Sequence, residues 1–407
     1  MVLSRAAPAT LGAELAALVT QVWPAAATGE LVTSIGDVPD GYVALERFRV
    51  LPNLARPQML LPERPRIAAA ALSTYNALRQ PRTRVFRRGA ATALRLGTGR
   101  LVTGAQLSVC VPAENAGSAP QLSLTHHLRD RLETGPLAAA IGLTNPGPNR
   151  KPILQLFDTA GAPVAFAKIG WNPVTRAMVD NEAAALEALA TDGVRYPARP
   201  QVLLHAPWQE RSVLATCPLP LDAAAYPHRG GPPPSLCESP RNAMTVTHTP
   251  LGESPYWHTV RQRSDALDAA AALSAAEAGA LRGALQAAEL HAGTAMDFGP
   301  WHGDWSFWNL ARIRGQLWAW DWEHYAASAP VGFDALHFVF QREFVHRRRS
   351  FANALRVAAD NVSVQHVVAS TLYPLEMYLR AARLYACGAG WNSRFHDGAL
   401  RWLSDLR

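Results

Sequence analysis

Two stretches decide how this chain is interpreted: Trp301-His302-Gly303-Asp304-Trp305-Ser306-Phe307-Trp308-Asn309 and, twelve residues after Asn309, Asp321-Trp322-Glu323. The carboxylate of Asp304 is followed five residues later by the carboxamide of Asn309. Residues 310–320, between the two stretches, contain two apolar runs around Arg314-Gly315-Gln316, a pattern typical of two short strands joined by a turn. Such a hairpin would bring Asp321 back beside Asn309.

These residue types suit one kind of chemistry. Asn309 and Asp321 would offer two oxygen ligands, which Mg²⁺ prefers as a hard cation. Asp304, close to that metal site, could accept the proton of an attacking hydroxyl group. Positioning of reactants and neutralisation of charge are the main requirements of phosphoryl transfer.

The pattern His-Gly-Asp-x-x-x-x-Asn followed by Asp-x-Glu resembles the signature of the aminoglycoside phosphotransferase family, relatives of protein kinases that phosphorylate small molecules. The resemblance implies that Asp304 is the catalytic base and that Asn309 and Asp321 hold magnesium. His302 is expected to support the loop, because no second His or Cys completes a zinc site. The alternative is a Trp-rich buried loop whose polar residues cap turns.

A second group of residues lies upstream. Residues 139–143, 152–157 and 164–169 are predicted strands joined by turns, which indicates an antiparallel meander, and a helix is predicted over 179–189. This order resembles the small lobe of the kinase-like fold. The resemblance implies that Lys168 contacts the α- and β-phosphates of ATP and that Glu182 pairs with Lys168.

The loop at residues 144–151 departs from the usual phosphate-binding pattern. It has no Gly-x-Gly-x-x-Gly, and its two prolines have no N–H to donate. We expect this loop to face the phosphates, with Asn149, Arg150 or Lys151 compensating for the missing backbone donors.

A strand is predicted over Arg211 to Thr216, followed by a proline-containing connector. By the same resemblance this segment is the hinge, where backbone groups near Ala215 and Cys217 would meet adenine. Residues 226–240 are rich in Pro, Gly and Ser, which predicts an exposed insertion.

The C-terminal part of the chain is expected to be mainly helical. Ser274 to Ala292 is predicted as a helix with a capping box to Glu277. Asp334 resembles the family's structural Asp, whose carboxylate braces the backbone of the catalytic loop; a helix N-cap is the competing explanation. Residues 339–405 are predicted to be helical, with a bend or break near Pro374.

Composition narrows the class of protein. The 407 residues are 49% apolar and 17% charged, which is typical of an ordered soluble protein of two or three domains. The four cysteines form no Cys-x-x-Cys pair, so we expect neither a zinc site nor a disulfide framework. No apolar run approaches the length of a membrane span. The expected location is the cytoplasm.

The charge of the chain leaves two explanations. The 39 Lys and Arg against 32 Asp and Glu give a formal charge of +7, which a nucleic acid or an anionic substrate would explain. No dense basic run favours nucleic acid, and a triphosphate cofactor accounts for a modest excess of positive charge. Residues 296–407 contain ten acidic residues against twelve Arg, which disfavours a polyamine as acceptor.

We therefore predict an α+β, protein-kinase-like bilobal fold with a small antiparallel β lobe and a large, mainly helical lobe. Residues 1–135 would form an N-terminal α/β extension without a functional motif, residues 136–217 the nucleotide-binding lobe, and residues 218–407 the catalytic and substrate lobe. The expected cofactors are ATP, with GTP as the alternative, and Mg²⁺, bound between the two lobes.

The predicted reaction is transfer of the γ-phosphoryl group to a hydroxyl of a small molecule. The acceptor classes left open are an antibiotic or other natural product, a sugar and an amino alcohol. Trp305 and Glu323 are candidate substrate contacts, with core packing an equal alternative for the Trp and a structural role for the Glu. The rival hypotheses are a catalytically silent, kinase-like nucleotide-binding module and a nucleic-acid-binding protein. The sequence assigns no oligomeric state.

Overall fold

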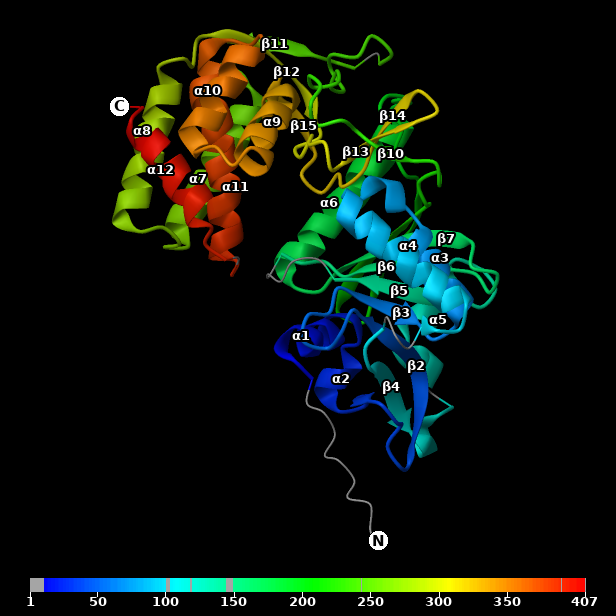
Figure 1. Ribbon diagram of the computed structural model, residues 1–407. Coiled ribbons are helices and arrows are strands. Elements are labelled where there is room, and N and C mark those ends of the chain that lie inside the picture. The colour runs from blue at the N-terminus through cyan, green and yellow to red at the C-terminus, as the bar shows by residue number, and fades with distance from the viewer. Residues whose placement is uncertain are drawn as a thin grey trace. The chain divides into compact units, whose positions relative to one another are not determined.

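The structure is a computed structural model, and it describes residues 11–99, 103–117, 119–143, 149–242, 244–388 and 390–406. The chain forms two compact units (Figure 1). Unit 1 comprises Met1–Pro146, Arg150–Asp180 and Pro200–Ala223, and unit 2 comprises Gly147–Asn149, Asn181–Arg199 and Ala224–Arg407.

Unit 1 is built on a nine-stranded sheet in the order β1-β4-β2-β3-β5-β6-β7-β9-β8, in which every neighbouring pair is antiparallel. The predicted meander is confirmed as β5, β6 and β7, and the predicted strand over 211–216 is β9. The strands of unit 1 are β1 (Val32–Ile35), β2 (Tyr42–Leu51), β3 (Met59–Pro62), β4 (Gln106–Pro112), β5 (Ala138–Gly142), β6 (Ile153–Phe157), β7 (Pro163–Gly170), β8 (Val202–Trp208) and β9 (Arg211–Thr216).

Helices cover both faces of this sheet, because the strands carry buried apolar residues on each side. On one face Leu15, Leu18 and Trp23 pack against strand residues of a shared core. On the other face Ile67 and Leu94 pack against a second set of strand residues. The helices of this unit are α1 (Ala13–Val22), α2 (Ala25–Thr28), α3 (Pro65–Ser73), η1 (Asn76–Leu78), α4 (Pro81–Arg95), η3 (Ala113–Asn115), η4 (Ala119–Leu122) and α5 (Leu124–Arg131), and α6 (Pro173–Thr191) begins here and ends in unit 2.

The predicted boundary at residue 135 falls inside this sheet. Strand β3 of the predicted extension pairs with β5 of the predicted nucleotide-binding lobe, at Met59–Gly142 and Leu60–Ile141. The two segments therefore share one set of backbone hydrogen bonds and a common core. The reason is that β5 needs a partner on the side away from β6, and β3 supplies it.

Unit 2 contains two three-stranded sheets, in the orders β10-β13-β14 and β11-β12-β15. The predicted hairpin is confirmed: Leu310 pairs with Ala319, and the turn residues Arg314 and Gly315 both have positive φ. The strands are β10 (Ala224–Ala225), β11 (Thr247–Pro250), β12 (Ala295–Trp301), β13 (Leu310–Ile313), β14 (Gln316–Ala319) and β15 (Ala326–Pro330).

The remaining secondary-structure elements of unit 2 are helices, as expected, and the α+β class predicted for the chain is confirmed. The capping box of Ser274 and Glu277 is present at the start of α8. Pro374 lies in the first turn of α11, directly after a π-helical turn. The helices are η5 (Leu251–Glu253), α7 (Pro255–Ala269), α8 (Ala275–Glu289), α9 (Phe333–Gln341), η6 (Arg342–His346), α10 (Phe351–Asn361), η7 (Val368–Leu372), α11 (Tyr373–Ala386) and α12 (Ser393–Ser404).

One predicted segment of unit 2 differs from the structure. Residues 226–240 were expected to form an exposed insertion, yet Leu236 is fully buried and Ser235 and Ser239 are nearly so. The carbonyl of Pro233 accepts a hydrogen bond from the indole of Trp305. A Pro- and Ser-rich composition predicts an irregular backbone, and here part of that backbone is packed into the unit, while Arg229, Pro234 and Glu238 are exposed.

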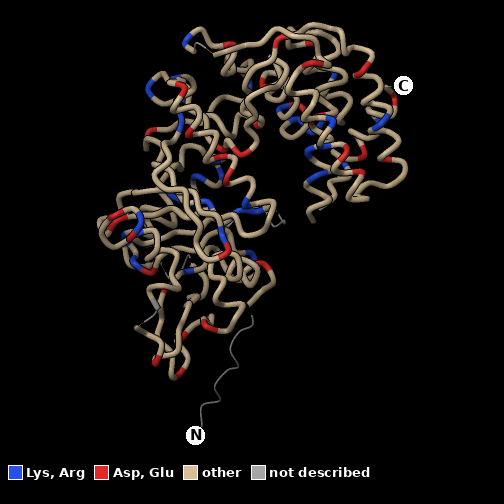
Figure 2. The backbone as a smooth tube through the Cα atoms, turned by 180° about the vertical axis from the view of Figure 1, so that it is seen from behind, with Lys and Arg blue, Asp and Glu red and all other residues tan. Residues whose placement is uncertain are grey.

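Charged residues are interspersed along the backbone of each unit (Figure 2). Within the described ranges, none of the helices combines the length and the apolar character that crossing a membrane requires.

Candidate active site

The loop that follows β12 is fastened to the first turn of α9. The carboxylate of Asp334 is buried and accepts hydrogen bonds from the backbone N–H of His302, at 3.0 and 3.2 Å, and from that of Gly303, at 3.3 Å. Burial raises the pKa of Asp334 to about 7, although both N–H groups oppose the rise. Gly332 is the N-cap of α9, so Asp334 contacts the loop backbone and does not cap the helix. Its expected role as the structural Asp stays a prediction, and these contacts are consistent with it.

Gly303 is required by the path of this loop. Its φ is +85°, and a Cβ at this position would lie 2.1 Å from the carbonyl oxygen of His324. The carbonyl of Gly303 also accepts a hydrogen bond of 2.6 Å from Arg380. The glycine between His302 and Asp304 therefore lets two parts of the backbone come close together.

His302 is fully buried and links the loop to the strand end beyond the hairpin. Its Nε2 lies 3.1 Å from the carbonyl of Trp320, and its Nδ1 accepts from the N–H of Asp304 at 3.2 Å. These partners fix a neutral ring with its proton on Nε2. Burial lowers the pKa of His302 to about 4. Its expected role as a support of the loop stays a prediction, and these contacts are consistent with it.

The neutral state of His302 predicts a pH dependence of stability. Between its ordinary pKa of 6.5 and about 4, the unfolded chain binds a proton that the native protein does not. The free energy of unfolding should therefore fall as the pH falls through this window, by roughly 3 kcal/mol from this group. We expect the gap in unfolding free energy between wild type and His302→Gln, measured by urea titration at several pH values, to narrow toward pH 4. A gap that is the same at every pH would contradict a buried neutral imidazole.

The carboxylate of Asp304 is held at both oxygens. Its Oδ1 lies 3.0 Å from Nε2 of His337, and its Oδ2 accepts from the side-chain amide of Asn309 at 2.8 Å. The same amide donates to the backbone carbonyl of Asp304 at 3.1 Å. The amide N–H₂ of Asn309 is thus turned toward Asp304, which leaves its side-chain oxygen as the atom to offer a metal ion.

His337 is a site residue that the sequence did not reveal. It lies on α9, one turn after Asp334, and is almost completely buried. Its Nδ1 is 3.0 Å from the hydroxyl of Tyr373, which is also buried. Since Nε2 faces a carboxylate, the consistent arrangement has Tyr373 donating to Nδ1 and Nε2–H donating to Asp304. The only signal in the sequence was a polar residue within the otherwise apolar run from Ala335 to Phe340.

This contact sets the electrostatics of Asp304. Burial by itself raises the pKa of its carboxyl group, but the hydrogen bond and charge interaction with His337 outweigh burial and hold the pKa below its ordinary value. The pKa of His337 is lowered by its burial, against the pull of Asp304. Asp304 is therefore ionised at neutral pH.

The hairpin brings Asp321 back to the loop, as predicted. The N–H of Trp320 donates to the carbonyl of Asn309 at 3.2 Å, one residue before Asp321. The φ of Asp321 is +71°, a conformation that Asp and Asn tolerate better than most residues. Candidate ligand oxygens of Asp321, Glu323 and Glu182 lie within 4.8 Å of one another. Three carboxylates at this spacing suit a divalent cation with oxygen ligands.

Two residues that the sequence predicted for other contacts lie in one acidic cluster with Asp321, which we define as Glu182, Asp321 and Glu323. Glu182, which the resemblance paired with Lys168, is buried and contributes to this cluster. For Glu323 the sequence left open whether the side chain contacts the substrate or has a structural role. Its carboxylate also belongs to this cluster. Its backbone carbonyl accepts a hydrogen bond from the side-chain amide of Asn181 at 2.9 Å. The pairing of Glu182 with Lys168 stays a prediction.

Trp305 lies in the interior. It is fully buried, its indole ring lies 5.5 Å from the ring of His302, and its N–H donates to Pro233. Of the two alternatives for this residue, core packing agrees with these contacts.

Lys168 lies in unit 1 on β7, opposite Leu214 of β9, and its side chain is half-buried. On the same face of the strand, Phe166 contacts the ring of Tyr75 at a centroid distance of 5.3 Å. The hydroxyl of Tyr75 donates to the carbonyl of Leu219, just beyond the predicted hinge. A residue of the N-terminal segment thus reaches the part of unit 1 that was predicted to meet adenine.

The two predicted hinge residues are tied into the sheet. Ala215 is fully buried between Ala167 of β7 and Leu204 of β8. The N–H of Cys217 donates to the carbonyl of Gln201 at 2.9 Å. This amide is therefore already used, and the adenine contacts predicted at both residues stay untested proposals.

Part of the predicted phosphate-facing loop, residues 144–148, lies outside the described residues. Asn149 is in a turn, and Arg150 is buried while its carbonyl accepts from the indole of Trp171. Within the described ranges, no acceptor lies within hydrogen-bond distance of Nε or Nη2 of Arg150, and no donor reaches Oδ1 of Asn149. A buried guanidinium with unused donors is suited to an anion.

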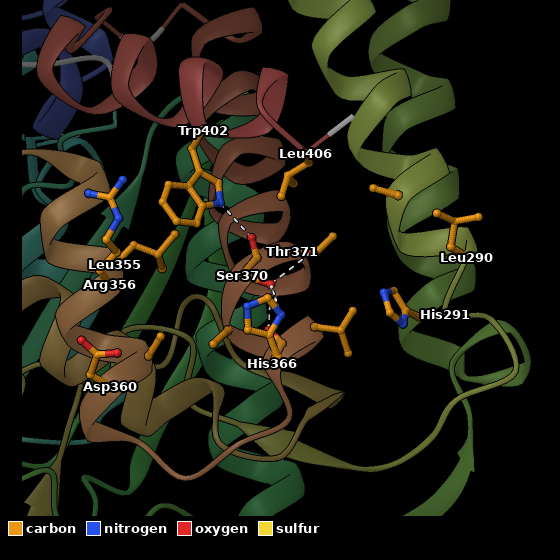
Figure 3. A pocket seen from close by; sticks show the side chains of 14 residues that line it. Leu290, His291, Leu355, Arg356, Asp360, His366, Ser370, Thr371, Trp402 and Leu406 are labelled. Atoms are coloured by element: carbon orange, nitrogen blue, oxygen red, sulfur yellow. Dashed lines mark hydrogen bonds between the residues drawn. The ribbon is translucent and has the colours of Figure 1, made fainter.

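A separate cavity of about 540 Å³ lies in unit 2 (Figure 3). Its wall is formed by α8, α10, η7 and α12, and includes His291, Arg356, His366 and Trp402. It contains none of the residues that the sequence predicted for the site.

The chain is similar to solved structures of small-molecule kinases. A choline/ethanolamine kinase family protein from Mesorhizobium loti has 17% identity and a TM-score of 0.40, with 69% of this chain and 94% of that chain covered. Amicoumacin kinase in complex with AMP-PNP, Ca²⁺ and Ami has 9% identity and a TM-score of 0.38, with 65% and 87% covered. Glucosamine kinase in complex with glucosamine, ADP and inorganic phosphate has 13% identity and a TM-score of 0.32, with 73% and 86% covered. No protein-family model matches the chain, and neither does a curated protein.

Proposed function

We propose that this chain is an ATP-dependent O-phosphotransferase that moves the γ-phosphoryl group of ATP onto a hydroxyl of a small molecule, with GTP as the alternative donor. The observation that carries the proposal is the way Asp304 is held, with His337 at one carboxylate oxygen and Asn309 at the other, 3.0 and 2.8 Å away. A carboxylate that is fixed and ionised in this way is suited to orient and deprotonate an attacking hydroxyl.

In the proposed step the acceptor oxygen forms a bond to the γ-phosphorus while the bond from that phosphorus to the β,γ-bridging oxygen breaks. The hydroxyl proton passes to the carboxylate of Asp304, and ADP leaves with the electron pair of the broken bond. His337 and Asn309 keep the carboxylate in place during the transfer. The backbone N–H groups held by Asp334 keep the loop itself in place.

The donor set fits a magnesium ion. Asn309 would offer a carboxamide oxygen, and Asp321 a carboxylate; Glu182 and Glu323 have carboxylate oxygens within 4.8 Å of that of Asp321. All are hard oxygen ligands of the kind that Mg²⁺ selects. When bound, the ion would neutralise the charge of the phosphates.

In unit 1 we propose two contacts to the phosphates. Lys168 would pair with the α- and β-phosphates, as the resemblance implies. The guanidinium of Arg150 would serve the same anion, because it is buried and has donors with no acceptor among the described residues. This assignment supplies the donors that the two prolines of the preceding loop cannot give.

The test is a screen of hydroxylated small molecules, including antibiotics, sugars and amino alcohols, with ATP, MgCl₂ and the full-length protein. We expect one class of compound to gain about 80 Da, the mass of one phosphoryl group, with release of ADP. If ATP is not consumed and no compound gains mass, the chain is not a phosphotransferase.

The acidic cluster predicts a response to magnesium that needs no turnover. Millimolar MgCl₂ should raise the melting temperature of the wild-type protein by about 2 °C, because the ion binds the native cluster and not the unfolded chain. Asp321→Asn should lose this response, because one of the three carboxylates that would hold the ion is gone.

Differential scanning fluorimetry with and without MgCl₂ measures both effects. Glu289→Gln, which alters an exposed carboxylate paired with Arg261, is the matched control and should respond as wild type does. An equal response of Asp321→Asn and wild type would place the ion elsewhere.

A further inference from the structure

The loop that carries Asp304 exposes an aromatic tip. The N–H of Asn309 donates to the carbonyl of Ser306 at 2.9 Å, which makes a tight turn with Phe307 and Trp308 at its centre. Both ends of this turn are tied to Asp304: the hydroxyl of Ser306 donates to its carbonyl, and the amide of Asn309 donates to its carboxylate. The two rings are therefore held within one turn of the proposed base.

Two imidazole rings extend this tip. Phe307 lies 5.9 Å from His228 and 5.8 Å from His346, and the two histidines are 4.2 Å apart. Trp308 contacts Phe307 at 4.8 Å and is 39% exposed. The three segments that meet here are the loop after β10, the catalytic loop and the π-helical turn η6. We call the four rings, His228, Phe307, Trp308 and His346, the ring surface.

A cluster of arginines lies beside the histidines of the ring surface. Glu343, fully buried on η6, is paired with Arg342, Arg347 and Arg349 at 2.9, 3.0 and 3.0 Å. Three guanidinium groups around one carboxylate leave an excess of positive charge. Arg347 and Arg349 are about half exposed, so their remaining donors face water.

The same charge acts on the ring surface. Burial lowers the pKa of His228, and the charges of His346, Arg229, Arg347 and Arg342 lower it further. Arg342 also donates to the carbonyl of Gly230, which ties the loop of His228 to η6. The lowered pKa of His228 favours its neutral form, a flat, uncharged ring beside fixed cations.

We infer that the ring surface and its arginines form the acceptor site, and that the acceptor is a flat, neutral or anionic molecule rather than a polycation. Flat rings stack on exposed aromatic side chains, and a carboxylate or phosphate on the acceptor would pair with Arg347 or Arg349. A polyamine would be repelled by the same arginines. This inference rests on the proposed function, because it takes Asp304 as the base that meets the acceptor hydroxyl.

The test compares three matched probes that each carry a primary alcohol: para-hydroxymethylbenzoate, its cyclohexane analogue, and para-aminomethylbenzyl alcohol. Binding to the full-length protein is measured by ligand-observed NMR, so no turnover is needed. We expect the benzoate to bind at least about threefold more tightly than the ammonium probe, and more tightly than the cyclohexane analogue. Equal binding of benzoate and ammonium probe, or no binding of any probe, would overturn the inference.

Variants locate the binding. Trp308→Ala should weaken binding of the benzoate by about threefold to tenfold, whereas Trp391→Ala, which removes a ring that is 37% exposed elsewhere in unit 2, should not. Arg347→Gln should reduce the preference for the anionic probe, with Arg261→Gln as control. Unchanged binding to Trp308→Ala would also overturn the inference.

The outcomes separate this inference from the proposed function. A preference for the benzoate without phosphoryl transfer to any hydroxyl compound would sink the proposed function and leave a binding site of this chemistry. Phosphoryl transfer to a polycation with no effect of Trp308→Ala would sink the inference alone.

Discussion

Replacing Asp304 with Asn should lower the rate of phosphoryl transfer by about 10³–10⁴-fold while nucleotide binding changes little. The variant keeps the size of the side chain and can still hydrogen-bond to His337 or Asn309, but an amide cannot accept the proton of the acceptor. The loss should therefore appear in kcat, with the Kd for ATP close to that of wild type. Single-turnover assays and calorimetric titration of nucleotide measure the two quantities separately.

The control for this variant is Asp297→Asn. Asp297 lies on β12, seven residues before Asp304, and its carboxylate is exposed and hydrogen-bonded to His248. The Asp297→Asn substitution removes one negative charge from the same segment of the chain and leaves the contacts of the Asp304 loop unchanged. We expect its activity to be close to that of wild type. If Asp304→Asn phosphorylates an acceptor at the wild-type rate, Asp304 is not the base.

His337→Leu should lower kcat by about 10²-fold, because the orientation of the Asp304 carboxylate is lost while its charge remains. His337→Gln can still donate an N–H to Asp304 and should recover part of this loss. The pH dependence of kcat/KM tests the role of His337 more specifically than the loss of kcat does. Without the hydrogen bond from His337, the largest influence that lowers the pKa of Asp304 is gone and its burial is opposed more weakly. The pKa should therefore rise, and the acidic limb of kcat/KM should move to higher pH.

A merely structural role for His337 would not move the acidic limb. Tyr373→Phe provides an intermediate case, because it removes the hydroxyl at Nδ1 of His337 and leaves the contact with Asp304 in place. We expect its activity to fall less than that of His337→Leu. An acidic limb at the same pH in wild type and His337→Leu would show that His337 does not act through Asp304.

Local signals in the sequence predicted the elements that carry the site. The hairpin at 310–319 followed from two apolar runs around a glycine, and the capping box of α8 from the spacing of Ser274 and Glu277. The closeness of Asn309 to Asp304 followed from the short loop that joins them. Each of these signals acts over a few residues, so the chain needs no distant partner to express it.

Distant partnerships were harder to predict. The pairing of β3 with β5 joins residues about eighty positions apart, and no local pattern encodes it. His337 meets Asp304 because Asp334 fastens α9 to the loop, so its role follows from a tertiary contact. The acidic cluster of Glu182, Asp321 and Glu323 was not anticipated, since the family resemblance implied only that Glu182 pairs with Lys168.

The sheet of unit 1 also limits how the polypeptide can be shortened. A truncated product beginning near residue 136 would lose β3 and leave the backbone groups of β5 bare along one margin. Unpaired strand edges form hydrogen bonds with the strands of other chains. Such a fragment would therefore aggregate and would not serve as a minimal catalyst. We therefore expect the first third of the polypeptide to be needed for solubility of the segment that bears Lys168.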